Sequence, residues 1–272
     1  MATKAPPDIL GIIAGIGVYP QLLADAARTA GVKKIIAAAF TKETDPILAQ
    51  HVDLIEWMRV GQLNRLLKFF NEHKVHHAIM AGQIAPKNLF DLRPDLKALL
   101  LLGKLKQRNA ESIFAAIADE LAKVDVDLLP ATTFLEDSLA SAGLITGAKL
   151  SRREEEDVDL GWKMAKEIAR LDIGQTVVVK NGTVVAVEAF EGTNDAIRRG
   201  GTLAREGAVM IKVAKPNQDM RFDVPVIGVE TIRVAAEAKL RVIAVEAGKT
   251  LLLERNVIAD LAAHSKLSII AR

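Results

Sequence analysis

The sequence predicts an α/β protein with two domains. We expect a Rossmann-like domain with a parallel sheet in residues 1–134 and a separate mixed αβ domain in residues 135–272. Half of the residues are hydrophobic and only 4% are aromatic, which is typical of buried α/β strands rather than an all-β sandwich. Apolar runs alternate with stretches of helical period. The composition changes before the charged run RREEED at 152–157, so we place the boundary between residues 132 and 147.

In the first half, each apolar run is followed by a helical pattern or a turn. Pro20 suits the first position of a helix, and Gly31 ends that helix. The expected strands are residues 9–14, 34–40, 52–57, 77–81 and 124–129, and the expected helices are residues 20–30, 61–73 and 109–123. This alternation favours parallel strands with crossover helices.

A glycine-rich turn follows the first strand and includes Gly15, Gly17 and Tyr19. A strand, a glycine loop and a helix N-terminus together make an anion-binding arrangement, which favours a nucleotide-like ligand. The spacing G-x-x-x-G-x-G is not the dinucleotide fingerprint, and no acidic residue closes the second strand. Gly82 and Gln83 end another strand at what would be the same sheet edge. The alternative is that the glycines serve only close packing.

Residues 86–108 are both basic and strongly apolar. One interpretation is a contact with an acyl chain or a membrane surface. The other is a core helix with a charged outer face.

The second half begins with the charged run, which suits a helix start, and continues with a helix over residues 158–171. Asn181-Gly182 predicts a tight hairpin turn between two apolar strands. The expected strands are residues 175–180, 184–190, 208–213, 241–247, 250–253 and 267–270, and the expected helices are a segment containing Arg198 and Arg199, residues 229–238 and residues 256–263.

The segment 212–228 joins a strand to a helix and is dense in charge. It is stiffened by prolines at 216 and 225, so it is neither a helix nor a central strand. Its cations are Lys212, Lys215 and Arg221, and its carboxylates are Asp219 and Asp223. Cations beside oxygen ligands suit a phosphorylated substrate held with a hard metal ion. The alternative is a solvated loop with ordinary ion pairs.

Several kinds of chemistry lack support in the sequence. There is no cysteine, P-loop, HExxH, Asp-x-His, Gly-Asn-His-Asp or G-x-S-x-G motif. A net charge of +2 gives no case for nucleic acid. No apolar stretch reaches the roughly 18 residues of a membrane span, and glycines interrupt the first apolar run, which argues against a signal peptide. The groups that remain as candidates for catalysis are carboxylates, lysines and backbone groups. We expect Asp223 to bind metal or position water, with Asp219 as its helper or, alternatively, as a salt-bridge partner.

With these motifs the chain resembles the LpxI family, the UDP-2,3-diacylglucosamine pyrophosphatases of lipid A biosynthesis. The matching segments are residues 11–20 (GIIAGIGVYP), 80–83 (MAGQ), 171–179 (LDIGQTVVV), 186–193 (AVEAFEGT), 212–228 (KVAKPNQDMRFDVPVIG) and 244–248 (AVEAG). Two positions depart from the pattern. Asn217 stands where a glycine is frequent, and Asn194 separates Thr193 from an aspartate that usually follows directly, which leaves Asp195 without a role.

The resemblance implies a two-domain enzyme with the substrate between the domains. It would hydrolyse UDP-2,3-diacylglucosamine with Mg²⁺ to UMP and 2,3-diacylglucosamine 1-phosphate (lipid X). It also implies the cytoplasm of a Gram-negative bacterium, with a peripheral position at the inner-membrane surface. Because the implied substrate is diacylated, we weigh the lipid-contact interpretation of residues 86–108 equally with the core-helix interpretation. A homodimer is a candidate assembly.

The expected catalytic residues are Asp223, Asp219 and Lys215, of which Asp223 and Asp219 would bind the metal. The expected substrate-binding residues are Gly15, Gly17, Tyr19, Gly82, Gln83, Gln175, Glu191, Thr193, Lys212 and Arg221. Two other kinds of function remain open: a nucleotide-sugar transferase or oxidoreductase that uses the Rossmann-like half, and a non-enzymatic carrier of lipid or nucleotide.

Overall fold

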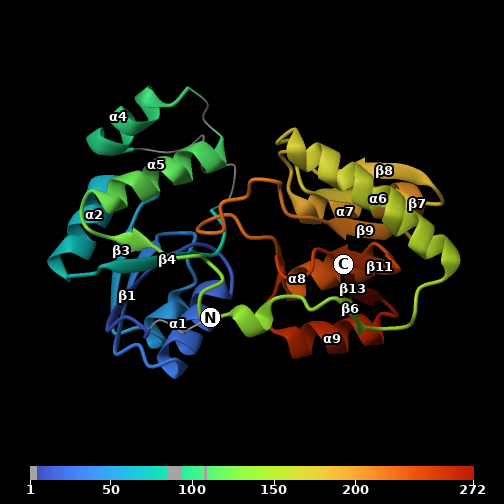
Figure 1. Ribbon diagram of the computed structural model, residues 1–272, viewed down its shortest axis with the longest axis horizontal. Coiled ribbons are helices and arrows are strands. Elements are labelled where there is room, and N and C mark those ends of the chain that lie inside the picture. The colour runs from blue at the N-terminus through green and yellow to red at the C-terminus, as the bar shows by residue number, and fades with distance from the viewer. Residues whose placement is uncertain (1–4, 85–93, 107–108) are drawn as a thin grey trace. The chain divides into compact units, whose positions relative to one another are not determined.

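The computed structural model describes residues 5–84, 94–106 and 109–272 (Figure 1). The chain forms two compact units. The first contains the residues up to Leu135 together with Asp219–Asp223, and the second contains Glu136–Gln218 and Val224–Arg272. Of the segment 86–108, residues 86–93 and 107–108 lie outside the described residues.

The first unit is built on a five-stranded sheet in the order β3-β2-β1-β4-β5. Every neighbouring pair is parallel, so the predicted Rossmann-like sheet is confirmed. The strands are β1 (Ile9–Ala14), β2 (Lys34–Phe40), β3 (Leu54–Met58), β4 (His77–Ala81) and β5 (Asp127–Leu128). The first, second and fourth have the predicted bounds, while β5 is shorter than the apolar run at 124–129.

Helices cover both faces of this sheet. Helices α2 and α5 pack on one face through a cluster that includes Phe70, Leu121 and Met80, and α1 contacts β1 and β4 from the other side (Figure 1). The helices are α1 (Tyr19–Thr29), α2 (Leu63–Glu72), α4 (Leu96–Lys104) and α5 (Ala110–Ala122), with a 3-10 helix at Pro46–Gln50. Pro20 lies in the first turn of α1, as predicted.

A short piece of the charged segment belongs to the first unit. The backbone N–H of Ala131 donates to the carbonyl of Met220 at 2.7 Å, and the Phe222 ring lies 5.8 Å from that of Phe114. Phe222 also packs against the apolar cluster of α2 and α5. We predicted that all of residues 212–228 belong to the second domain, whereas Asp219–Asp223 group with the first unit because of these contacts.

The second unit contains a six-stranded mixed sheet in the order β6-β13-β11-β9-β7-β8. Its three central strands, β13, β11 and β9, are parallel, and β6, β7 and β8 run antiparallel to their neighbours. The bounds are β6 (Gly143–Thr146), β7 (Thr176–Lys180), β8 (Thr183–Val187), β9 (Val209–Lys212), β11 (Val242–Val245) and β13 (Ser268–Ala271). A separate pair joins β10 (Val226–Ile227) to β12 (Leu251–Leu252).

Helices also cover both faces of this second sheet (Figure 1). Helix α6 packs on the face that carries Val177, Val179 and Ile211, while Val178, Met210 and Ile243 point to the opposite cluster. The helices are α6 (Arg152–Arg170), α7 (Thr193–Ala204), α8 (Val229–Glu237) and α9 (Arg255–His264), with a 3-10 helix at Glu136–Ser138. The predicted mixed αβ domain is therefore confirmed.

Local sequence explains where the elements of the second unit begin and turn. Helix α6 starts at Ser151, whose side chain accepts from the N–H of Glu154 while the Glu154 carboxylate accepts from the N–H of Ser151. Asn181 and Gly182 have φ of 52° and 75°, as the predicted hairpin turn requires. The edge strand β6 was not predicted: we assigned residues 143–146 to the boundary, and Leu144 in this strand is exposed.

Candidate functional site

The turns after β1 and β4 pair with each other at the carboxyl edge of the first sheet. The N–H of Gly15 donates to the carbonyl of Ala81 at 2.8 Å. Ile16 and Gln83 exchange two backbone hydrogen bonds, at 2.7 and 3.3 Å. The structure therefore brings together Gly15, Gly82 and Gln83, which were predicted from separate parts of the sequence.

The three glycines at this edge are required for different reasons. A Cβ on Gly15 would lie 2.7 Å from the Gln83 carbonyl oxygen, and one on Gly82 would lie 2.7 Å from that of Ile16. Close packing accounts for these two positions. Gly17 has a φ of +96°, and a Cβ there would meet nothing within 4 Å. Gly17 is therefore the position that leaves open space beside the N-terminus of α1.

Tyr19 connects this edge to the charged segment. Its side chain is buried and its hydroxyl donates to the carbonyl of Ala131. Burial raises the pKa of Tyr19 above its ordinary range, so the hydroxyl stays protonated as a donor. The N–H of Ala131 in turn donates to Met220. Two hydrogen bonds thus join the start of α1 to the residues between Asp219 and Asp223.

Asp219 and Arg221 form a closed ion pair. The Asp219 carboxylate accepts from the Arg221 backbone N–H at 3.1 Å, from Nε at 3.0 and 3.1 Å, and from Nη2 at 2.6 Å. The hydrogen bonds from Arg221 lower the pKa of Asp219, and burial opposes them. The guanidinium also lies 5.8 Å from the centre of the Phe222 ring. Arg221 is consequently held in one orientation.

This pairing bears on the expected metal site. A carboxylate has about four lone-pair positions, and the two oxygens of Asp219 accept from three N–H groups of Arg221, of which Nε contacts both oxygens. A cation on Asp219 would compete with the guanidinium for the same carboxylate. Among the described residues, no group of three or more His, Asp or Glu could hold a metal ion. The donors present fit a Mg²⁺ held by one or two carboxylates and completed by substrate phosphates, so the assignment of Asp223 and Asp219 as metal ligands stays a prediction.

A second group of predicted residues gathers at the edge where β9 ends. Lys212, 5% exposed, is the last residue of β9 and lies opposite Thr176 at the start of β7. Its Nζ donates to the hydroxyl of Thr193 at 2.7 Å, and that hydroxyl donates to the Glu188 carboxylate at 2.7 Å. Lys212, Thr193 and Glu188 therefore form one hydrogen-bonded chain, the Lys212 chain.

The carboxylate in the Lys212 chain is buried and charged. Glu188 is 7% exposed, and burial works against its ionisation. The nearby charge of Lys212 and the hydrogen bond from Thr193 outweigh burial, so the pKa of Glu188 is lowered. Within the described part of the chain, Oε2 of Glu188 and the side-chain oxygen of neighbouring Gln175 accept no hydrogen bond. These two acceptors lie at the strand ends that carry Lys212.

Glu246 organises the backbone that leads from Lys212 to Lys215. It follows β11, and its carboxylate accepts from the Ala214 N–H at 2.8 Å, from Lys166 Nζ at 2.5 Å and from Lys249 Nζ at 2.8 Å. Burial opposes the charge of Glu246, yet the hydrogen bonds from Lys166 and Lys249 lower its pKa. Ala214 is thereby fixed directly before Lys215.

Lys215 itself is half-buried. Its ammonium pairs with Asp172, and its backbone N–H donates to the Gln218 side chain at 2.7 Å. Glu191, another predicted residue, pairs with Arg199 and accepts from the N–H of Ala189 at 3.1 Å. Glu191 thus has a local partner on α7, outside the Lys212 chain.

From the sequence we counted Glu188 among the carboxylates available for chemistry but gave it no role, and we did not single out Glu246. Glu188 directly follows the half-buried edge strand β8 and Glu246 directly follows the buried strand β11, each within the same short run, Ala-Val-Glu-Ala, at 186–189 and 244–247. An acidic residue at the carboxyl end of an apolar strand was the signal that could have found them.

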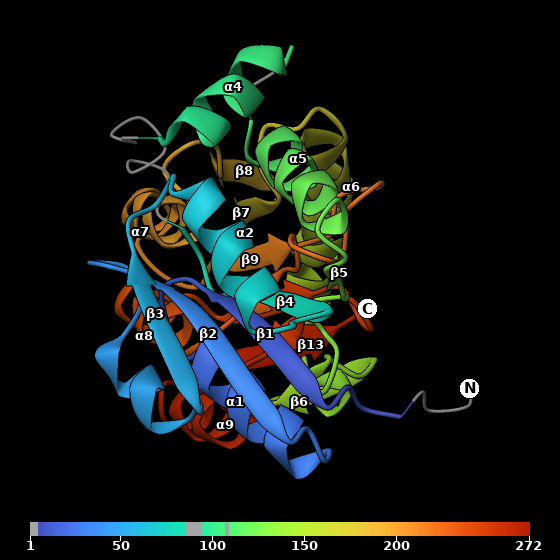
Figure 2. The same ribbon diagram turned by 90° about the vertical axis from the view of Figure 1, so that its left-hand side faces the viewer.

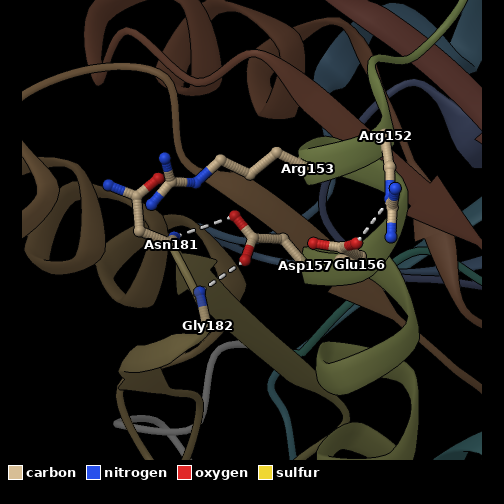
Figure 3. A pocket seen from close by; sticks show the side chains of 6 residues that line it. All are labelled: Arg152, Arg153, Glu156, Asp157, Asn181 and Gly182. Carbon is tan, nitrogen blue, oxygen red and sulfur yellow. Dashed lines mark hydrogen bonds and ion pairs between the residues drawn. The ribbon is translucent and has the colours of Figure 1, made fainter.

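A pocket elsewhere on the second unit is lined by residues at the start of α6 and by the β7–β8 turn (Figure 3). The Asp157 carboxylate there accepts from the N–H groups of Asn181 and Gly182 at 2.9 and 2.6 Å, and Arg152 pairs with Glu156. This turn lies at the opposite end of β7 from Thr176. The Asp157 contacts tie the hairpin to the helix and account for the pocket structurally.

Comparison with known proteins decides the family. Residues 9–138 match the LpxI N-terminal domain and residues 141–270 match the LpxI C-terminal domain. The chain belongs to the LpxI family. It is 30% identical over 260 residues to the UDP-2,3-diacylglucosamine pyrophosphatase LpxI of Caulobacter vibrioides, with 92% of each chain covered. The resemblance to LpxI found in the sequence is confirmed.

The two LpxI domain matches meet near the boundary of the compact units, since one match ends at 138 and the other starts at 141. Among the described residues, no helix is long and apolar enough to cross a membrane.

Proposed function

We propose that this LpxI family member hydrolyses the pyrophosphate bond of UDP-2,3-diacylglucosamine, a step of lipid A biosynthesis. The products would be UMP and 2,3-diacylglucosamine 1-phosphate. The observation that carries the proposal is the match to a relative named for this pyrophosphatase activity, over 92% of both chains. The absence of thiols and of a serine elbow motif from the sequence also favours direct attack by water.

In this reaction water forms a bond to one phosphorus, the bridging P–O bond breaks, and the water proton passes to a base. The charge on the phosphate oxygens must be compensated as the bond breaks. We assign this compensation to Lys212, Lys215 and Arg221. The contacts that hold these cations in position support the assignment. Lys212 is linked to Glu188 through Thr193, Lys215 pairs with Asp172, and Arg221 pairs with Asp219.

Asp223 is our candidate for the group that orients water or binds metal. It lies in the turn made by Asp219, whose carbonyl accepts from the Asp223 N–H at 3.0 Å. Mg²⁺ would be bound by Asp223 and by phosphate oxygens of the substrate, and when bound it would neutralise charge on the pyrophosphate. Asp219 serves in this proposal to position Arg221. The contacts of its carboxylate with two guanidinium nitrogens support that role over metal binding.

The nucleotide end would be bound by the first unit, where Gly17 leaves open space beside the α1 N-terminus. Tyr19 acts as a positioning residue, since its hydroxyl is already donated to Ala131. On the second unit, Gln175 and Glu188 offer acceptors for hydroxyl groups of the substrate. We place the reaction in the cytoplasm of a Gram-negative bacterium, at the inner-membrane surface.

The test is incubation of the purified protein with detergent-solubilised UDP-2,3-diacylglucosamine and Mg²⁺, with and without EDTA. We expect equal amounts of UMP and the sugar phosphate, and loss of both in EDTA. Product formation only after addition of an acceptor or NAD would identify a transferase or an oxidoreductase. Tight binding without turnover across several divalent metals would identify a carrier and refute the proposal.

A further inference from the structure

Helix α4 presents leucines to solvent on its outer face. Leu96 is 73% exposed, Leu99 55% and Leu100 58%. At 3.6 residues per turn these three side chains span an arc of about 100°, and Gly103, also exposed, continues the same face. In both views α4 lies outside α2 and α5, at the periphery of the first unit (Figures 1 and 2). We call Leu96, Leu99 and Leu100 the leucine face.

The opposite side of α4 is packed and anchored. Ala98 is buried and Leu101 packs against the same cluster as α2 and α5. At the N-terminus, the Asp95 carboxylate accepts from the N–H of Ala98 at 2.9 Å and from that of Asn64, in α2, at 2.7 Å. Lys97 pairs with Glu120 of α5 at 3.0 Å. The leucine face is therefore the outer surface of a fixed helix.

This arrangement does not fit the interpretation of the described part of the segment as a core helix with a charged outer face. A core helix would turn charged residues outward, but here the outward residues are leucines. Monomeric soluble proteins seldom expose several large apolar side chains side by side unless something binds there.

Lysines lie beside the C-terminal end of the leucine face. Lys104, at the end of α4, and Lys106, just after it, are both exposed. Among the described residues neither lysine makes an ion pair. By helical spacing Lys104 shares a flank with Lys97, between the leucine face and the packed side. Exposed lysines beside exposed leucines match a bilayer whose headgroups are anionic.

We propose that the leucine face of α4, with Lys104 and Lys106, docks this protein on the surface of an anionic phospholipid bilayer. The helix has nine residues, or about 14 Å, so it lies in the interface and does not span it. The inference rests on the proposed function in one respect: a diacylated substrate resides in a bilayer, and docking brings the enzyme to it.

The experiment is flotation of the full-length protein with vesicles of phosphatidylcholine alone or mixed with phosphatidylglycerol. The wild type should bind the mixed vesicles, and less strongly at high salt. Combined Leu96→Ser, Leu99→Ser and Leu100→Ser should lower that partitioning by about tenfold or more. Combined Lys104→Gln and Lys106→Gln should remove most of the salt dependence. Leu203→Ser is the matched control, since Leu203 is 63% exposed on α7 of the other unit, and should change nothing.

Turnover of detergent-solubilised substrate separates this inference from the proposed function. The leucine variants should keep wild-type kcat and KM in detergent while losing vesicle binding. Failure of the wild type to bind mixed vesicles, or unchanged binding by the triple variant, would overturn the inference. A raised KM in detergent with unchanged vesicle binding would instead make the leucine face an acyl-chain contact. Conversion of a dimer to a monomer, seen by light scattering with vesicle binding intact, would make it an interface between copies.

Discussion

Replacing Thr193 with valine tests how Lys212 is positioned. Valine keeps the shape of threonine but lacks the hydroxyl that accepts from Lys212 at 2.7 Å and donates to Glu188 at 2.7 Å. The substitution leaves a buried ammonium and a buried carboxylate each one hydrogen bond short. Serine at the same position retains the hydroxyl and is the matched control.

The size of the effect follows from the charges involved. A hydrogen bond to a charged group contributes about 1.5–3 kcal/mol, and the two bonds here share one hydroxyl, so we expect Thr193→Val to cost about 3 kcal/mol of unfolding free energy. If Lys212 binds a phosphate in the transition state, the loss of a similar free energy of transition-state stabilisation lowers kcat/KM by about 100-fold. Thr193→Ser should stay within about 1 kcal/mol and tenfold of the wild type.

Urea unfolding gives the free energy, and UMP release against substrate concentration gives kcat/KM. A Thr193→Val variant that loses stability but keeps wild-type kcat/KM would show that the Lys212 chain serves folding alone. Equal behaviour of the valine and serine variants in both assays would refute the assignment of the hydroxyl as the link.

Three further predictions follow from the same contacts. The folded-state pKa of Glu188 is lowered from its ordinary 4.5, so the stability that its charge contributes is complete above pH 4.5 and is lost as the pH falls through the folded-state pKa. The free energy of unfolding, measured in urea from about pH 6 to 3, should therefore decrease more steeply for the wild type than for Glu188→Gln. Parallel curves for the two proteins would contradict this. Gly17→Ala should lower the free energy of unfolding by about 1–2 kcal/mol because Gly17 has a positive φ. Gly15→Ala should lower it by more, as measured by thermal unfolding, because the added Cβ would lie 2.7 Å from a carbonyl oxygen. The reverse order of the two variants would contradict the packing argument. Asp219→Asn should lower kcat/KM about tenfold by loosening Arg221 while the Mg²⁺ concentration for half-maximal activity stays unchanged; a shift in that concentration would make Asp219 a metal ligand.

The strands that could be predicted are those whose burial is continuous. Strands β1, β2 and β4 are apolar runs ended by glycine or polar turns, and their bounds agree with the sequence. The short strands β6 and β10 could not be found in this way, because one is an exposed edge and the other has two residues. Their pairing depends on partners distant in sequence.

Some features of the candidate site could likewise be predicted from the sequence, and others could not. The density of charge at 212–228 indicated the segment, and its composition favoured a phosphate ligand. Which carboxylate pairs with which cation is a property of the folded chain: Asp219 pairs with Arg221, and the Thr193 hydroxyl links Glu188 to Lys212. Sequence spacing alone could not separate a metal ligand from a salt-bridge partner.

Helix α4 shows a different limit. Its sequence, LKALLLLGK, is apolar on almost every side, so periodicity could not tell which residues face the core. Only the packing of Ala98 and the anchoring of Asp95 identify the inner side. The exposed leucines are thus a result of tertiary structure.

The most direct test of the account compares Mg²⁺-dependent UMP release by the wild type and by Asp223→Asn. We expect the wild type to release UMP and 2,3-diacylglucosamine 1-phosphate in equal amounts, and Asp223→Asn to bind the substrate but release UMP at least about 100-fold more slowly. Release at the wild-type rate with an unchanged Mg²⁺ dependence would contradict the role given to Asp223.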